Sequence, residues 1–94
     1  MPIPYPIDHF CEDLLTVLQN SHPRLFWEIT GDDNSQTGKV IAMMRYDQSR
    51  IAFSYPFSYE AILSFPGRSD AVAIMSDRIA SEIGNEIGHF FLGK

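Results

Sequence analysis

The five consecutive apolar residues from Val40 to Met44 restrict the fold of this chain more than any other feature. They belong to a segment, 39–46, whose composition is typical of a β-strand. In an antiparallel sheet with one face in water, apolar and polar residues alternate along each strand. The run from Val40 to Met44 does not alternate, so both faces of this strand are apolar. Each face must therefore be covered by another element or be available to a partner.

The neighbouring segments predict two further strands beside this one. We expect strands at 24–30 and 50–55, joined to the central strand by a polar loop at 31–38 and a short turn at 47–49. Because short connections favour antiparallel neighbours, the three strands are expected to form a meander.

Amphipathic helices are predicted on both sides of the strands. Residues 7–20 carry apolar side chains at three- and four-residue spacing, and a proline follows that cannot continue a helix. A longer helix is predicted from Ser69, a suitable N-cap, to about Phe91. Gly84 and Gly88 lie inside it, and each costs roughly 1 kcal/mol relative to alanine. This cost suggests either a close backbone approach or loose packing.

The segment 56–66 has two interpretations. Every second residue is apolar at Phe57, Tyr59, Ala61, Leu63 and Phe65, which is typical of a fourth strand. We favour the strand, and a short helix through 58–63 is the alternative.

These elements predict an α+β fold. The order is a helix, a three- or four-stranded antiparallel meander and a long C-terminal helix, in one domain over residues 1–94. The proline-rich residues 1–6 are expected to form an extended arm.

The composition limits the classes of partner and the compartment. Seven Lys and Arg residues against 12 Asp and Glu residues give a formal net charge of -5, which repels nucleic-acid backbones and suits a protein that meets basic protein surfaces. The single cysteine, Cys11, excludes an intrachain disulfide and indicates the reducing cytoplasm. No stretch approaches the ~20 apolar residues of a membrane-spanning helix, and an N-terminus without basic residues is not typical of a signal peptide.

No group of residues in the sequence predicts catalysis or metal binding. His9 and Cys11 are two residues apart and point to different sides of the predicted helix, and no second pair completes a zinc site. Cys11 lies among the apolar residues of that helix, where a small buried side chain is expected. The acidic loop 31–38 lacks the glycine and the closing glutamate of a calcium-binding loop. We expect no catalytic residue, no metal ligand and no cofactor.

An interaction surface is predicted if both helices cover the same face of the sheet. The uncovered face then presents four apolar residues, Phe26, Ile41, Met43 and Ala52. Around them lie the charged residues Arg24, Glu28, Lys39, Arg45 and Arg50. An apolar centre with a charged rim is typical of a protein interaction site. If one helix covers each face instead, the strand is an ordinary core strand.

Two groups of residues are the candidates for partner binding. In the first, apolar side chains anchor the partner and arginines set the register, and its members are Phe26, Ile41, Met43, Arg45 and Arg50. The second is an aromatic segment around a proline, formed by Tyr55, Phe57 and Tyr59. Packing at the end of the sheet is the alternative role of these three aromatic residues.

The order of the predicted elements resembles two known families. It is similar to that of double-stranded-RNA-binding domains, in which a lysine-rich start of the last helix contacts phosphates. Here that helix begins GRSDAVAIM, in which Arg68 is the only cation. A small acidic chain with helices flanking a meander also resembles bacterial secretion chaperones, which implies a homodimer that holds a client segment across apolar patches.

The sequence thus predicts a non-enzymatic protein-binding module of the adaptor, inhibitor or chaperone-like kind. Its partner is another protein, including a second copy of itself. Two other classes stay open. A nucleic-acid-binding domain requires a basic stripe on one sheet face, formed by Arg24, Lys39, Arg45 and Arg50. A small hydrolase or transferase requires His9 or His89 beside a carboxylate.

Overall fold

The computed structural model describes residues 7–92, so the arm expected at 1–6 lies outside the described residues. The elements are α1 (Ile7–Ser21), β1 (Phe26–Asp32), β2 (Thr37–Tyr46), β3 (Ser49–Ser58), α2 (Tyr59–Leu63) and α3 (Arg68–Leu92). The three strands form one antiparallel sheet in the order β1-β2-β3. The predicted α+β fold, with a meander between two long helices, is confirmed.

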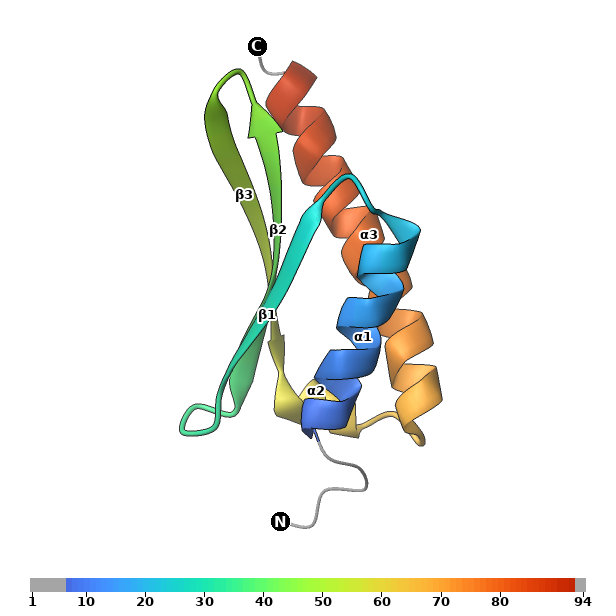
Figure 1. Cartoon of the computed structure of the whole chain (residues 1–94). Helices are drawn as coiled ribbons and strands as arrows, with labels where there is room; N and C mark the ends of the chain where they lie inside the picture. The colour runs from blue at the N-terminus through green and yellow to red at the C-terminus, as the bar shows by residue number, and fades with distance from the viewer. Residues whose placement is uncertain (1–6, 93–94) are drawn as a thin grey trace.

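Both long helices lie on the same side of the sheet, as Figure 1 shows. α1 contacts β1, α3 contacts β3, and the two helices contact each other. The molecule is therefore a two-layer sandwich, with extents of 46 × 26 × 19 Å. α3 has 25 residues and is about 37 Å long, so it follows most of the length of the sheet. None of the described helices is both long and apolar enough to cross a membrane.

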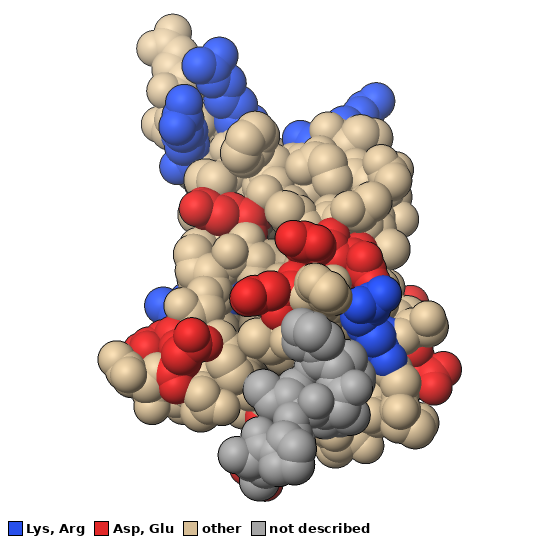
Figure 2. Space-filling view, turned by 60° about the horizontal axis from the view of Figure 1, so that its bottom comes forward, with Lys and Arg blue, Asp and Glu red and all other residues tan. Residues whose placement is uncertain are grey.

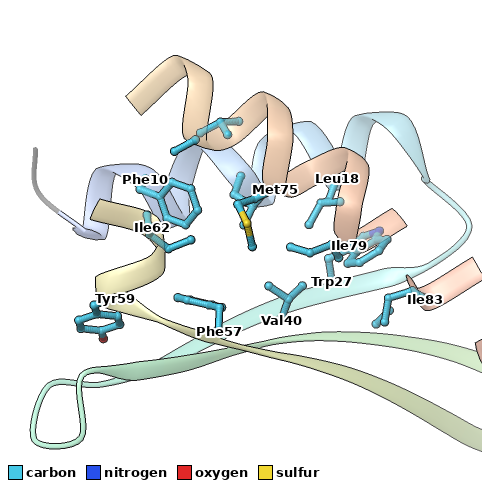
Figure 3. Packing of buried hydrophobic residues seen from close by; sticks show 14 of the residues in the cluster. Phe10, Leu18, Trp27, Val40, Phe57, Tyr59, Ile62, Met75, Ile79 and Ile83 are labelled. Atoms are coloured by element: carbon cyan, nitrogen blue, oxygen red, sulfur yellow. The ribbon is translucent and has the colours of Figure 1, made fainter. Parts of the chain in front are cut away.

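The hydrophobic core lies between these two layers (Figure 3). The sheet contributes every second residue of its strands, including Trp27, Val40, Ala42, Phe53 and Phe57. The helices contribute residues at helical spacing, including Phe10, Leu14, Leu18, Met75, Ile79 and Ile83. Because successive strand residues point to opposite faces, this pattern buries one face of the sheet. Each fully buried large side chain stabilises the fold by roughly 1.5–3 kcal/mol.

The end of α1 is tied to the start of β1 by side-chain hydrogen bonds. The Gln19 amide donates to the carbonyl of Leu25 at 3.1 Å and accepts from the Trp27 N–H at 3.4 Å. The Trp27 indole N–H donates to the carbonyl of His22 at 3.1 Å. These bonds turn the indole of Trp27 toward the helices, so the side chain of the preceding residue, Phe26, points away from them.

The fourth strand expected over 56–66 is wrong, because residues 56–58 are the end of β3 and the short helix α2 follows directly. The Ser58 hydroxyl accepts a hydrogen bond from the Ala61 N–H at 3.2 Å and so caps the helix. The alternation at Phe57 and Tyr59 belongs to the end of β3 and the first residue of α2, and both rings are buried. Alternating apolar residues that continue past a strand end do not distinguish a strand from one helical turn.

Gly38 gives the ring of Phe57 room to lie against β2. A Cβ at residue 38 would lie 2.5 Å from that ring and 2.8 Å from the carbonyl oxygen of Thr30. Gly31 is its cross-strand partner, and a Cβ there would lie 2.5 Å from the Tyr59 hydroxyl. Both glycines are therefore required by the aromatic rings that cover this end of the sheet.

The two glycines of α3 have a different setting. A Cβ at Gly84 or Gly88 would meet no atom within 4 Å. The close backbone approach considered for this helix is therefore not present in the described part of the chain, and both glycines lie beside open space.

The hairpin between β2 and β3 has a two-residue turn. Asp47 and Gln48 both have positive φ angles, 50° and 68°, which is the backbone of a type I′ turn. This turn fixes the register of the two strands, in which Arg45 lies opposite Arg50. Two arginines are thereby held side by side near the end of the sheet.

Candidate interaction surface

The sheet face turned away from the helices has no covering element in the part of the chain that the structure describes. We call it the outer face. It consists of Phe26, Glu28 and Thr30 of β1, Lys39, Ile41, Met43 and Arg45 of β2, and Arg50, Ala52, Ser54 and Pro56 of β3. Both long helices therefore lie on one face of the sheet, and this arrangement leaves an apolar surface exposed on the other face.

A row of apolar side chains crosses the outer face from one edge to the other. Phe26 pairs with Met43, and Met43 pairs with Ala52. We call these three residues the apolar row. Phe26 is 69% exposed, Ala52 is exposed, and Met43 is half-buried by its neighbours. Ile41 adds a further half-buried apolar side chain in the next row, between Glu28 and Ser54.

A hollow of about 270 Å³ lies at one end of the apolar row. It is lined by Arg24, Phe26, Met43, Met44, Arg45 and Arg50. The hollow arises because β1 begins opposite Met43, whereas β2 and β3 continue to their turn. Beyond Phe26, the edge of β2 therefore has no neighbouring strand. We call this site the arginine hollow, since three cations surround an apolar floor.

The arginines of the hollow have no ion pair within the described residues. The one ion pair among the described residues lies elsewhere and joins Arg68 Nε of α3 to Asp13 Oδ2 of α1, at 3.0 Å. On the face that Figure 2 shows, several Lys and Arg side chains lie at the upper end of the view and others at its sides, whereas the Asp and Glu side chains lie across its middle and lower parts. A protein with an excess of acids thus holds three unneutralised cations around one apolar site.

The aromatic residues predicted as a second binding group do not form an exposed rim. Phe57 and Tyr59 are 7% and 5% exposed, and Tyr55 is half-buried on the face toward the helices. The Tyr59 hydroxyl donates a hydrogen bond to Asp33 Oδ1 at 3.3 Å. Burial, followed by the charge of Asp33 and this bond, raises the pKa of Tyr59. These three residues are packing residues, because β3 directs them into the core.

The histidine and carboxylate pair that the hydrolase hypothesis requires is absent from the described residues. His9 Nδ1 accepts a hydrogen bond from the Arg68 guanidinium, at 3.2 Å, and no histidine within residues 7–92 forms an ion pair with a carboxylate. His89 lies 21 residues beyond Arg68 in α3, or about 32 Å along the helix.

The single thiol lies in an environment that keeps it protonated. Cys11 is half-buried in α1 beside the core. Burial, together with the nearby charge of Asp8, raises the pKa of Cys11 from 9.0 to about 11. Because the thiolate is the nucleophile, such a cysteine reacts poorly at neutral pH.

The remaining hollows do not gather reactive groups. One, of about 770 Å³, lies between α1 and α3, and its lining is mostly serine, threonine and aliphatic residues with Asp13, Asp77 and His22. No cluster of three or more His, Cys, Asp or Glu side chains within the described residues could hold a metal ion. The arginine hollow is a site where charge and exposed apolar area coincide.

Two residues of the arginine hollow, Arg24 and Met44, were not among the predicted partner-binding residues. Arg24 was expected inside the first strand, where it would have paired with the central strand. The structure begins β1 at Phe26, which leaves Arg24 outside the sheet and opens the hollow beside Met44. Pro23, which precedes Arg24, was the available sequence signal for a later strand start.

Comparisons with known protein families, with curated proteins and with solved structures found no match. The geometry of the outer face is therefore the observation that bears on function.

Proposed function

We propose that this protein is a non-enzymatic protein-binding module that acts through the outer face of its sheet. One observation supports the proposal most: Phe26 is 69% exposed at the edge of an apolar row that neither helix covers. Exposed apolar area with a charged rim is typical of protein interaction sites. The methionine in the row suits a surface that adapts to its partner.

Burial of the apolar row is the expected source of affinity. Burying about 300 Å² of apolar area contributes roughly 7 kcal/mol before the costs of association. The arginines around the row add selectivity, because they favour acidic partners and repel basic ones. We therefore expect moderate affinity that depends on both the apolar row and the charges beside it.

A protein partner is favoured over a nucleic-acid partner because the outer face carries both positive and negative charges. Glu28 lies between the arginine hollow and Lys39, so the four cations do not form a continuous stripe. One observation favours nucleic acid instead. Phe26 lies beside three arginines, and an aromatic ring among cations also binds single-stranded nucleic acid. Titration with a fluorescent oligo(dT) strand tests this second candidate, for which binding must weaken steeply with salt.

Photo-crosslinking tests the proposed function directly. A benzoyl-phenylalanine at position 26 replaces one aromatic side chain by another, and the same group at the exposed Ser81 of α3 is the control. In cells that naturally make the protein, position 26 should give defined adducts with protein that position 81 does not give. Equal labelling at the two positions, or none at position 26, would contradict a binding role for the outer face.

A further inference from the structure

The charges along β2 follow an order that reverses across the apolar row. Two residues from Met43 on one side lies Arg45, next to Arg50 and the arginine hollow. Two residues from it on the other side lies Ile41, which pairs with Glu28. Each step of two residues is about 7 Å along the strand. Positive charge and negative charge therefore lie at equal distances from the row.

The same relation continues one step further. Four residues from Met43 on one side, about 13 Å along β2, lies Lys39, and four residues on the other side, just beyond the end of β2, lies Asp47 of the turn. From the turn toward Lys39, the order of charges is therefore negative at Asp47, positive at Arg45, apolar at Met43, negative at Glu28 and positive at Lys39. When this order is reversed about its centre, every charge meets its opposite. None of these charged residues has an ion pair within residues 7–92.

We propose that two copies of this chain associate by their outer faces, on a two-fold axis that runs along the apolar row and across the strands. The proposal rests on the proposed function and names its partner. The apolar row of one copy packs on that of the other. Glu28 of each copy approaches Arg24 and Arg45 of the second copy, and Lys39 approaches Asp47 of the second copy.

The distances of sheet packing suit this arrangement. Facing sheets lie about 10 Å apart, which glutamate and arginine side chains can bridge between them. The Glu28 carboxylate of the second copy enters the arginine hollow, where its partners have no competing acid. A two-fold axis along β2 would place Arg45 over Arg45 of the second copy and Arg50 over the Arg24 end of its β1, and the repulsion between like charges disfavours it.

The proposed interface is small. It involves fewer residues than the roughly 20–30 per side of a standard interface. We therefore expect a weak dimer, whose population rises with protein concentration in the micromolar range.

Charge reversal with rescue tests the pairing. Light scattering and sedimentation equilibrium should show the mass of the wild-type chain rising toward twice 10.7 kDa with concentration. Glu28→Lys alone, and Arg24→Glu with Arg45→Glu, should each weaken the dimer at least tenfold. An equal mixture of the two proteins should recover a mixed dimer, because Lys at position 28 then faces Glu at positions 24 and 45.

Matched controls separate this pairing from the general effect of net charge. Glu82→Lys makes the same charge change as Glu28→Lys, and Arg78→Glu makes the change of one of the two arginine substitutions, both on exposed positions of α3. Both controls should leave the dimer unchanged. Circular dichroism of every variant should show the wild-type fold. An equal effect of the controls, or no recovery in the mixture, would overturn the proposed register.

Cysteine crosslinking with a short bis-maleimide locates the axis. In a Cys11→Ser background, Met43→Cys lies on the axis and should link to itself. Ile41→Cys should not link to itself, but it should link to Arg45→Cys in a mixture, because these positions face each other. Self-linking at position 41 as efficient as at position 43 would contradict the axis.

The results also separate this inference from the proposed function. A wild-type chain that stays monomeric at all concentrations overturns the dimer. If position 26 still crosslinks to other proteins in cells, the outer face keeps its binding role with a foreign occupant. If oligo(dT) binds and the arginine variants abolish that binding, both proposals are replaced by the nucleic-acid function.

Discussion

Adjacent residues of similar chemistry have opposite roles in this protein. Phe26 and Trp27 are both large aromatics, yet the first is 69% exposed and the second 4% exposed. The alternation of a strand separates them, and the hydrogen bonds of Trp27 to Gln19 and His22 decide which one points inward. Cys11 illustrates the same dependence on surroundings, since its place in α1 beside the core determines its chemistry.

The chemistry of Cys11 gives a pH-dependent prediction. Its pKa is about 11 in the folded protein, against 9.0 for an unperturbed thiol. Between these values the folded state keeps a proton that the unfolded state loses, so the stabilising contribution is complete below pH 9 and falls as the pH rises toward 11. Alkylation of the native protein by iodoacetamide should be slow at pH 8 and should rise with a midpoint near pH 11.

The control for this measurement is the same titration in urea, where the midpoint should return to about 9. A native midpoint at or below 9 would show that the thiol is not desolvated. Charge on Asp8 is the second cause of the shift, so Asp8→Asn should lower the native midpoint.

At the level of elements, periodicity identified the helices well and failed at the end of the sheet. The apolar spacing of residues 7–20 and the stripe that begins near Ser69 correspond to α1 and α3. The segment after β3 has too few residues for its period to be recognised, and the Ser58 cap decides for a helical turn. Long elements carry several repeats of their pattern, whereas a five-residue helix carries less than two turns.

The C-terminal half of α3 supplies a prediction for this helix. Gly84→Ala should raise the free energy of unfolding by about 1 kcal/mol, because alanine loses less backbone entropy and the new methyl group meets no atom. Thermal or urea unfolding measures the change. Gly38→Ala is the contrasting control and should destabilise the protein, because its Cβ collides with the backbone of β1 and with Phe57. If Gly84→Ala destabilises the protein instead, another part of the molecule must pack closely against α3 at this position.

At the scale of the whole molecule, the placement of both helices on one face determines where binding can occur. The same strand, β2, then has one face in the core and one outside. Val40 is fully buried, while Met43 of the same apolar run lies on the outer face. The residues of this apolar run therefore have two roles: those on the inner face stabilise the core, and those on the outer face belong to the proposed interaction surface.

The same substitution on the two faces of β2 tests this division. Met43→Glu should leave a folded chain with a free energy of unfolding within about 1 kcal/mol of wild type, because the carboxylate stays in water. Val40→Glu should unfold most of the protein, because it places an unpaired carboxylate in the core. Urea unfolding at low protein concentration measures both. If Met43→Glu also unfolds the chain, Met43 is a core residue and the outer face loses its role.

The sequence by itself determined the fold class, the order of the strands and the two sets of residues that share each sheet face. These depend on local periodicity and on short connections, which are properties of neighbouring residues. It also predicted Phe26, Ile41, Met43, Arg45 and Arg50 as one surface, conditional on where the helices lie. Only the tertiary structure decided that both helices cover the same face, that β1 begins at Phe26 and that Phe57 and Tyr59 point inward. Those outcomes depend on packing between residues far apart in the chain, for which a pattern along one strand carries no information.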